Sequence, residues 1–299
     1  MARKRKGNRI DGWLVVDKPA GVTSAGVVNK LRWVLGAQKA GHSGTLDPDA
    51  TGCLAVAFGE ATKLIPVAQG GPKSYQFTLR WGLATSTDDG AGEVIAEASH
   101  RPTEAQIRAA LPAFRGEICQ VPPQVSAVKV AGARAYDLAR AGEALDLAAR
   151  PLTVHSLELR ARPDPDHASF DFTCASGGYV RAIARDLGEA LGTLAHVTTL
   201  RRLATGPFDL ADAWPGDPMA LQKGETLPLL APAAGLRGQP HLTVSEAQAA
   251  DLRQGRAIPA ETPAIWASHN GQPVALGAVR EGLFHPSRVL APPPDDHPR

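Results

Sequence analysis

The sequence predicts an α+β domain followed by a smaller, mostly β domain. Its 299 residues suffice for about two domains. Segments with a period of two are mixed irregularly with segments of helical period, which is typical of an α+β fold rather than of a regular strand–helix array. Six prolines between residues 207 and 240 mark a change of composition, so we place the domain boundary near Trp214.

The first two elements are a strand and a helix. Residues 12–16 are apolar and end at a turn, which predicts a strand. The helix begins at Thr23 or Ser24, because hydroxyl side chains cap helix N-termini, and it ends at Gly36, because glycine favours the helix C-terminus.

The small residues and turn formers of residues 41–52 predict a loop. An apolar strand at 53–58 and a short helix at 60–65 follow this loop. Apolar residues alternate with polar ones from 75 to 81, which predicts a half-buried strand.

The remainder of the first domain is predicted in the same way. Thr103 and Gln106 form a capping box, which predicts a helix after them. Further strands are expected at residues 152–159, 169–173 and 196–203, with a helix at 180–191.

The second domain is expected to be small. A capping box at Ser245 predicts a helix to about residue 254, and short strands are expected at 274–279 and 283–290 around a turn at Gly282. The predicted organisation is a basic tail at 1–9, a first domain at 10–213, a second domain at 214–290 and a disordered tail at 291–299.

Charge is distributed unevenly along the chain. The formal net charge is only +2, which alone argues against a dedicated nucleic-acid-binding protein. The first forty residues nevertheless carry nine basic and two acidic side chains, a net charge of +7. The opening segment therefore has the charge needed to attract a polyanion.

Cysteine content and hydrophobicity limit the compartment. The three cysteines, Cys53, Cys119 and Cys174, are odd in number and far apart, so we expect neither a disulfide framework nor a zinc site. The apolar run at 13–16 is too short for a signal peptide or a membrane span. We expect a cytoplasmic protein with no membrane contact.

Common cofactor and hydrolase motifs are absent from the sequence, which contains no P-loop, no dinucleotide fingerprint, no HExxH and no GxSxG. The segment GHSGTLDPDATG at 41–52 instead presents His42, Asp47 and Asp49 on a tight loop. Taken singly, Asp47 could be an Asx-turn residue before Pro48, His42 a hydrogen-bonded loop histidine and Asp49 a solvated carboxylate.

A second notable segment is GGYVRAIARDLG at 177–188. Tyr179 stands at the expected helix start, and Arg181 and Arg185 lie four residues apart on one face. This pattern fits either an ordinary surface helix or a helix that presents functional side chains.

Several runs, taken together and in order, resemble one known family. They are GWLVVDKPAGVTS at 12–24, GHSGTLDPDATGCL at 41–54, GEATK at 59–63, Lys73-Ser74-Tyr75, PPQVSAVKVAGARAYDLAR at 122–140, and GGYVRAIARDLGEALG with AHVTTLRRLATGPF at 177–208. They resemble the TruB family of bacterial tRNA pseudouridine synthases across residues 10–210.

The resemblance implies an enzyme that isomerises the uridine at position 55 in the T-loop of tRNA. It implies a mixed-sheet pseudouridine synthase domain, no cofactor and no metal. It also implies that the second domain is a small β-barrel of the PUA-like, RNA-binding type.

The resemblance also implies residue roles. Asp47, Tyr75 and Arg181 would be catalytic, with Asp47 as the essential carboxylate, Arg181 favouring its charged form and Tyr75 stacking on the uracil near C5. The residues expected to bind the substrate base and loop are His42, Lys18, Tyr179 and Leu200. The residues expected to contact the RNA backbone are Lys63, Lys129, Arg134, Arg201 and Arg202.

The target uridine is stacked and paired, so it has to be flipped out, and His42 would help to hold the loop open around the vacated position. Residues 122–150 resemble an insertion that closes over the RNA in this family. The sequence is compatible with three roles for Asp47. It could attack the ribose, attack the uracil, or accept a proton as a general base.

Two other functions are compatible with the same motifs. One is a guide-dependent enzyme that modifies rRNA within a ribonucleoprotein, which the lack of a long basic C-terminal extension disfavours. The other is a noncatalytic protein that binds or folds tRNA. We expect the stand-alone enzyme, a monomer that binds the T-arm of tRNA and needs no protein partner.

Overall fold

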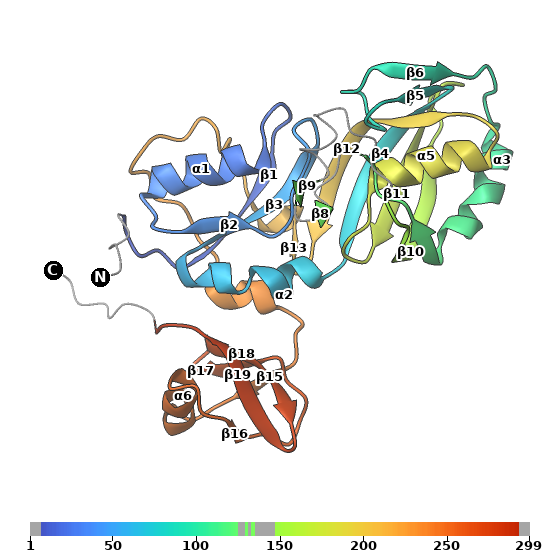
Figure 1. The fold of residues 1–299 in the computed structure, drawn as a ribbon. Helices are drawn as coiled ribbons and strands as arrows, with labels where there is room; N and C mark the ends of the chain where they lie inside the picture. Colours follow the sequence, from blue (N-terminus) through green and yellow to red (C-terminus); the bar gives the residue numbers. More distant parts are fainter. Residues whose placement is uncertain (1–6, 125–128, 131–132, 135–146, 293–299) are drawn as a thin grey trace. The chain divides into compact units, whose positions relative to one another are not determined.

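The computed structural model describes residues 7–124, 129–130, 133–134 and 147–292. The chain divides into two compact units. Figure 1 shows their helices and strands, coloured along the sequence. Unit 1 comprises residues 1–48, 52–71 and 205–299, and unit 2 comprises residues 49–51 and 72–204. Within the described part, no helix has both the length and the apolar character needed to cross a membrane.

Unit 1 begins with a small sheet covered by a helix. Strand β1 pairs antiparallel with β3 and parallel with β14, while β2 pairs antiparallel with β3. The sheet is therefore mixed, as the family resemblance implies. Its elements are β1 (Gly12–Lys18), α1 (Ser24–Leu35), β2 (Ala40–His42), β3 (Thr51–Phe58), the 3₁₀ helix η1 (Gly59–Lys63), α2 (Ile65–Gly70) and β14 (Ala213–Trp214).

Helix α1 begins and ends at the capping residues predicted from the sequence. The Thr23 side chain accepts a hydrogen bond from the Gly26 N–H, and Gly36 ends the helix with φ of 60°. The apolar face of α1 packs against β1 and β3 in one hydrophobic cluster, which includes Val27, Leu31, Val16 and Val56. This packing fixes α1 beside the loop that precedes β3.

The C-terminal part of unit 1 is a five-stranded sheet in the order β15-β17-β18-β19-β16. Helix α6 begins at a capping box formed by Ser245 and Gln248, as predicted. The elements of this part are β13 (Phe208–Asp209), η3 (Leu210–Asp212), η4 (Pro232–Leu236), β15 (His241–Thr243), α6 (Glu246–Arg253), β16 (Ile258–Pro259), β17 (Trp266–His269), β18 (Gln272–Arg280) and β19 (Leu283–Val289).

Unit 2 is a sheet in the order β12-β4-β11-β10-β7, with helices α3 and α5. The apolar face of α5 packs on the sheet, where Val180, Ile183 and Leu187 join Phe170 and Phe172 in one core. The elements of unit 2 are β4 (Lys73–Trp81), β5 (Leu83–Thr85), β6 (Val94–Glu97), α3 (Glu104–Ala110), η2 (Leu111–Phe114), β7 (Gly116–Gln120), β8 (Lys129–Val130), β9 (Ala133–Arg134), β10 (Arg150–Ala161), β11 (His167–Cys174), α5 (Val180–Ala190) and β12 (Ala195–Thr205).

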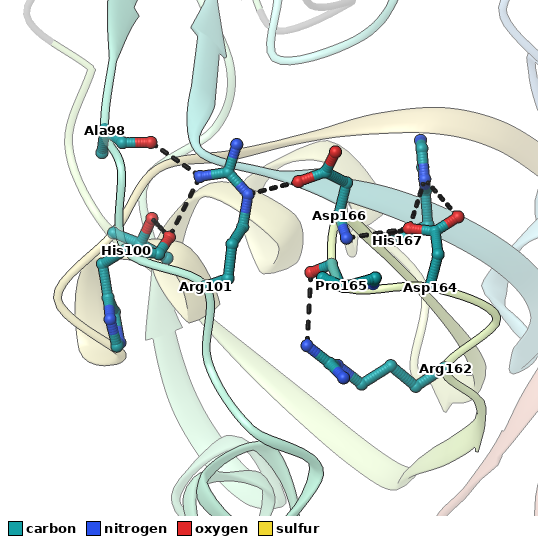
Figure 2. A network of polar contacts seen from close by, with 9 residues as sticks. Ala98, His100, Arg101, Arg162, Asp164, Pro165, Asp166 and His167 are labelled. Atoms are coloured by element: carbon teal, nitrogen blue, oxygen red, sulfur yellow. Dashed lines mark hydrogen bonds and ion pairs between the residues drawn. The ribbon is translucent and has the colours of Figure 1, made fainter.

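A polar network holds the turn between β10 and β11 (Figure 2). The Arg101 side chain donates to the Asp166 carboxylate and to the Ala98 carbonyl. The His167 ring nitrogen Nδ1 lies 3.0 Å from the Asp164 carboxylate. The network ties the segment before α3 to the turn and lies entirely within unit 2.

Several elements differ from the prediction. The expected helix at 60–65 is the 3₁₀ helix η1, followed by the separate helix α2. Strand β2 occupies the start of the expected loop, because its three residues pair with the end of β3. The insertion expected at 122–150 lies largely outside the described residues.

Candidate active site

The residue before Asp47 is held by the hydroxyl of Ser24. This hydroxyl accepts from the Leu46 N–H at 2.8 Å and donates to the Leu46 carbonyl at 3.0 Å. Ser24 is 1% exposed, so both bonds are shielded from water. Ser24 is the first residue of α1, so the start of this helix fixes the backbone just before Asp47.

The residue after Asp47 is held by Lys18. The Lys18 ammonium donates to the carbonyls of Pro48 at 2.8 Å, Pro19 at 2.8 Å and Val22 at 2.7 Å. The Gly21 N–H also donates to the Pro48 carbonyl, at 3.0 Å. Because an ammonium group has three N–H donors, these carbonyls engage all of them. Lys18 is fully buried and organises the loop from inside.

Asp47 itself is half-buried between these two anchored neighbours. His42 is half-buried at the end of β2, and its Nδ1 accepts from the Gly44 N–H at 3.3 Å. Accepting at Nδ1 leaves the proton of a neutral imidazole on Nε2. The expected substrate-binding histidine and the expected catalytic aspartate thus belong to one braced loop of unit 1.

Arg181 is positioned by the turn at residues 87–90, which the sequence motifs above do not include. Its guanidinium donates to the Thr87 carbonyl at 2.9 Å and forms an ion pair with Asp89 at 3.5 Å. Arg181 is 7% exposed, so the turn determines where this cation can lie. The signal in the sequence is the run Thr-Asp-Asp-Gly at 87–90, a turn pattern in which Asp88 adopts a positive φ of 58°.

One helical turn along α5, Arg185 contacts the same turn. Its guanidinium lies 3.4 Å from the Asp88 carboxylate and 2.8 Å from that of Asp186. Burial raises the pKa of Asp88, against the lowering effect of the Arg185 charge. Burial likewise raises the pKa of Asp186. Arg181 and Arg185, on one helix face as predicted, both face this acidic turn.

Tyr75 lies on the buried face of β4. It is 7% exposed, and its ring centroid lies 6.1 Å from that of Phe172 on β11. Lys73 lies on the same face two residues earlier, and its ammonium donates to the Ser176 hydroxyl at 3.1 Å. Burial and the charge of Arg202 lower the pKa of Lys73 to about 8.

The remaining expected substrate residues also lie in unit 2. Tyr179 is half-buried directly before α5, and both of its backbone polar groups bond to Gln120. Leu200 is partly buried on β12 against the core of unit 2. Of the expected catalytic residues, Asp47 therefore belongs to unit 1, and Tyr75 and Arg181 belong to unit 2.

The expected RNA-backbone residues have different environments. The Lys63 ammonium donates to Glu60 and to the Val289 carbonyl at 2.8 Å. Arg201 is half-buried, with its guanidinium 3.4 Å from the Thr51 hydroxyl, and Arg202 is 1% exposed. Lys129 and Arg134 are partners in the backbone register of strands β8 and β9.

Over the ranges that the structure describes, no group of three or more His, Cys, Asp and Glu side chains is arranged to hold a metal ion. Unit 1 contains a loop that carries Asp47 and is held by hydrogen bonds on both sides of it. Unit 2 contains the buried Arg181 and, on its sheet, the ring of Tyr75. A carboxylate on an anchored loop is suited to acid–base or nucleophilic chemistry.

Comparison with known proteins identifies the family. A model of the TruB family pseudouridylate synthase N-terminal domain matches residues 32–180, and a model of the tRNA pseudouridylate synthase B C-terminal domain matches residues 181–218. A protein of Cereibacter sphaeroides named tRNA pseudouridine synthase B is 57% identical over 97% of this chain and 99% of its own length. The chain belongs to the TruB family of pseudouridylate synthases. The resemblance seen in the sequence is thereby confirmed.

Other similar proteins agree with this assignment. The tRNA pseudouridine synthase B of Ruegeria pomeroyi is 54% identical over 98% of this chain and all of its own length. Among solved structures, an H/ACA ribonucleoprotein bound to a substrate RNA aligns with a TM-score of 0.69 at 19% identity, covering 98% of this chain and 92% of that one. A Cbf5–Nop10–Gar1 complex aligns with a TM-score of 0.68 at 22% identity, covering 94% and 84%. These structural likenesses confirm the α+β fold of the TruB family chain.

Proposed function

We propose that this protein converts uridine 55 in the T-loop of tRNA to pseudouridine, acting alone. The similarity that carries the proposal is the 57% identity, over nearly the whole of both chains, to a protein named tRNA pseudouridine synthase B. The braced loop around Asp47 supports it, because an essential carboxylate needs a fixed position relative to the reacting base.

The reaction balances without an external reactant. The N1–C1′ bond of uridine breaks, the uracil rotates and a C5–C1′ bond forms. The proton on C5 leaves, and N1 ends with a proton, so product and substrate are isomers. Asp47 supplies the carboxylate on which cleavage of the N1–C1′ bond depends.

The other residues prepare the base for this step. Arg181 favours the ionised form of Asp47, and Tyr75 supplies an apolar ring for the uracil with a polar tip near C5. His42 helps to hold the T-loop open once the uridine is flipped out, which costs a few kcal/mol of stacking and pairing. Tyr179 and Leu200 contact the substrate base and loop.

Affinity for the T-arm comes mainly from basic side chains. Lys63, Lys129, Arg134, Arg201 and Arg202 contribute positive charge toward the RNA backbone, and residues 214–290 act as a PUA-like RNA-binding domain. The three N–H donors of Lys18 are directed at backbone carbonyls. Lys18 therefore contributes to substrate binding by holding the Asp47 loop in place. In this proposal the protein is a cytoplasmic monomer.

The test is turnover by the pure protein on an unmodified tRNA transcript that carries tritium at uridine C5. We expect tritium release without any added guide RNA or protein, and none from a transcript with cytidine at position 55. Asp47→Asn should abolish release while the affinity for tRNA stays within about threefold, because the amide keeps the shape but lacks the charge.

Each alternative gives a different result. Turnover that requires a guide RNA or a partner protein would indicate a guide-dependent enzyme. Binding of tRNA with no release of tritium would indicate a noncatalytic tRNA-binding protein. Full activity of Asp47→Asn would remove Asp47 from the reaction.

A further inference from the structure

Helix α5, which carries Arg181, starts at a position that its own residues specify poorly. The N-cap residue is Tyr179, which makes no side-chain capping bond. Tyrosine is not among the residues that favour this position. Gly177, with φ of 100°, and Gly178 precede it and leave the backbone flexible. The start of α5 therefore has to be fixed by something outside the helix.

Gln120, the last residue of β7, provides this external contact. Its carboxamide oxygen accepts from the Tyr179 N–H at 2.9 Å, and its carboxamide nitrogen donates to the Tyr179 carbonyl at 3.1 Å. The two groups thus form a paired hydrogen bond like that between adjacent strands. Gln120 is 3% exposed, so water does not compete for these bonds.

The next residue gives a second attachment. The Val121 carbonyl accepts from the Arg185 guanidinium at 2.9 Å. Tyr179 and Arg185 are six residues apart, about 9 Å along a helix axis. Contacts at two separated points fix the direction of α5 as well as its starting point.

We infer that Gln120 is a positioning residue for the proposed isomerisation. It sets the start of α5 and thereby the positions of Tyr179 and of Arg181, two residues further on. Gln120 acts through its two hydrogen bonds to the backbone of Tyr179. This inference rests on the proposed function, because it concerns how the groups of that reaction are held.

The test replaces Gln120 by residues that remove one or both bonds. Gln120→Met keeps a similar length and volume but makes neither bond. Gln120→Asn keeps a carboxamide that is one methylene too short to reach both backbone groups. Gln106→Met is the matched control, because Gln106 forms the capping box of α3 on the exposed surface of the same unit.

We expect kcat of Gln120→Met to fall about 10- to 100-fold, since a displacement of about 1 Å can cost on the order of 100-fold. Gln120→Asn should lie between this variant and the wild type. KM and the affinity for tRNA should stay within about threefold in both, and Gln106→Met should keep the wild-type kcat. A residue that served folding alone would lower the melting temperature without changing the kcat of the folded protein.

A folded Gln120→Met protein with wild-type kcat would overturn the inference, as would a loss confined to tRNA affinity. If Gln120→Met does not fold, the same test is made with Gln120→Asn: the inference requires a lower kcat with an unchanged KM. Absence of turnover in the wild type would instead refute the proposed function, and the inference with it.

Discussion

A single hydroxyl, that of Ser24, holds both backbone groups of Leu46 and so fixes the residue before Asp47. Ser24→Ala would leave a buried N–H and a buried carbonyl without these bonds. We expect a loss of about 2–6 kcal/mol in the free energy of unfolding, because each of the two buried unsatisfied groups costs about 1–3 kcal/mol. The measurement is urea denaturation, combined with kcat of the folded variant, which should fall because Asp47 is less firmly placed.

Ser287→Ala is the matched control for this prediction. The Ser287 hydroxyl makes one bond, to the Leu276 carbonyl at 3.2 Å, in the C-terminal sheet. Its loss should cost less than about 1.5 kcal/mol and leave kcat unchanged. Equal effects of the two substitutions on kcat would contradict the role assigned to Ser24.

Lys73 gives a prediction for the dependence of stability on pH. Burial and the charge of Arg202 lower the pKa of Lys73 from 10.5 to about 8 in the folded protein. Between these two values the unfolded chain binds more protons at this site than the folded chain. The contribution of Lys73 to the free energy of unfolding therefore increases as the pH rises from about 8 to about 10.

Lys73→Met removes this titration, and the comparison isolates it from other groups that titrate in the same range. We expect urea denaturation at pH 7.5 and at pH 9.5 to show a larger change for the wild type than for Lys73→Met, with the wild type gaining relative stability at the higher pH. An identical change in both proteins would show that Lys73 keeps its ordinary pKa.

At the scale of elements, helices with clear ends were predictable from the sequence. Helix α1 begins at Ser24 after the Thr23 cap, and α3 and α6 begin after their capping boxes. These signals are local, so they can be read from a few adjacent residues. Strands with strict alternation, such as β4, were predictable for the same reason.

Short strands were not predictable, because their existence depends on distant partners. Strand β2 has three residues and forms only because the end of β3 lies beside it. The β5–β6 hairpin, Leu83–Thr85 with Val94–Glu97, lacks a continuous alternating pattern, and its second strand is exposed throughout. Whether such a segment forms a strand depends on its pairing partner in the folded protein and not on its local propensity.

The same distinction applies to the candidate site. Asp47, Tyr75 and Arg181 stand in motifs that the sequence displays directly. The contacts that hold their surroundings span long separations: 22 residues from Ser24 to Leu46, 59 from Gln120 to Tyr179 and 94 from Thr87 to Arg181. Such contacts become visible only once the fold has brought the segments together.

At the scale of the whole molecule, the core of unit 1 combines both ends of the chain. Trp13 is fully buried, lies 4.9 Å from Phe208 between ring centroids, and shares a hydrophobic cluster with Trp266 and Leu290. Backbone bonds of 2.8 Å in both directions join Trp13 to Leu230. The C-terminal strands therefore contribute to the same core as the sheet that supports the Asp47 loop.

Deletion of residues 240–299 should consequently destabilise unit 1 rather than remove an independent domain. We expect the melting temperature to fall by more than about 5 °C, since about 1 kcal/mol corresponds to roughly 2–4 °C in a chain of this size. Deletion of residues 293–299 alone is the control and should leave the melting temperature unchanged, because the sequence of this segment predicts a disordered tail. A truncated protein that keeps the wild-type melting temperature but binds tRNA more weakly would show that residues 240–299 serve RNA binding alone.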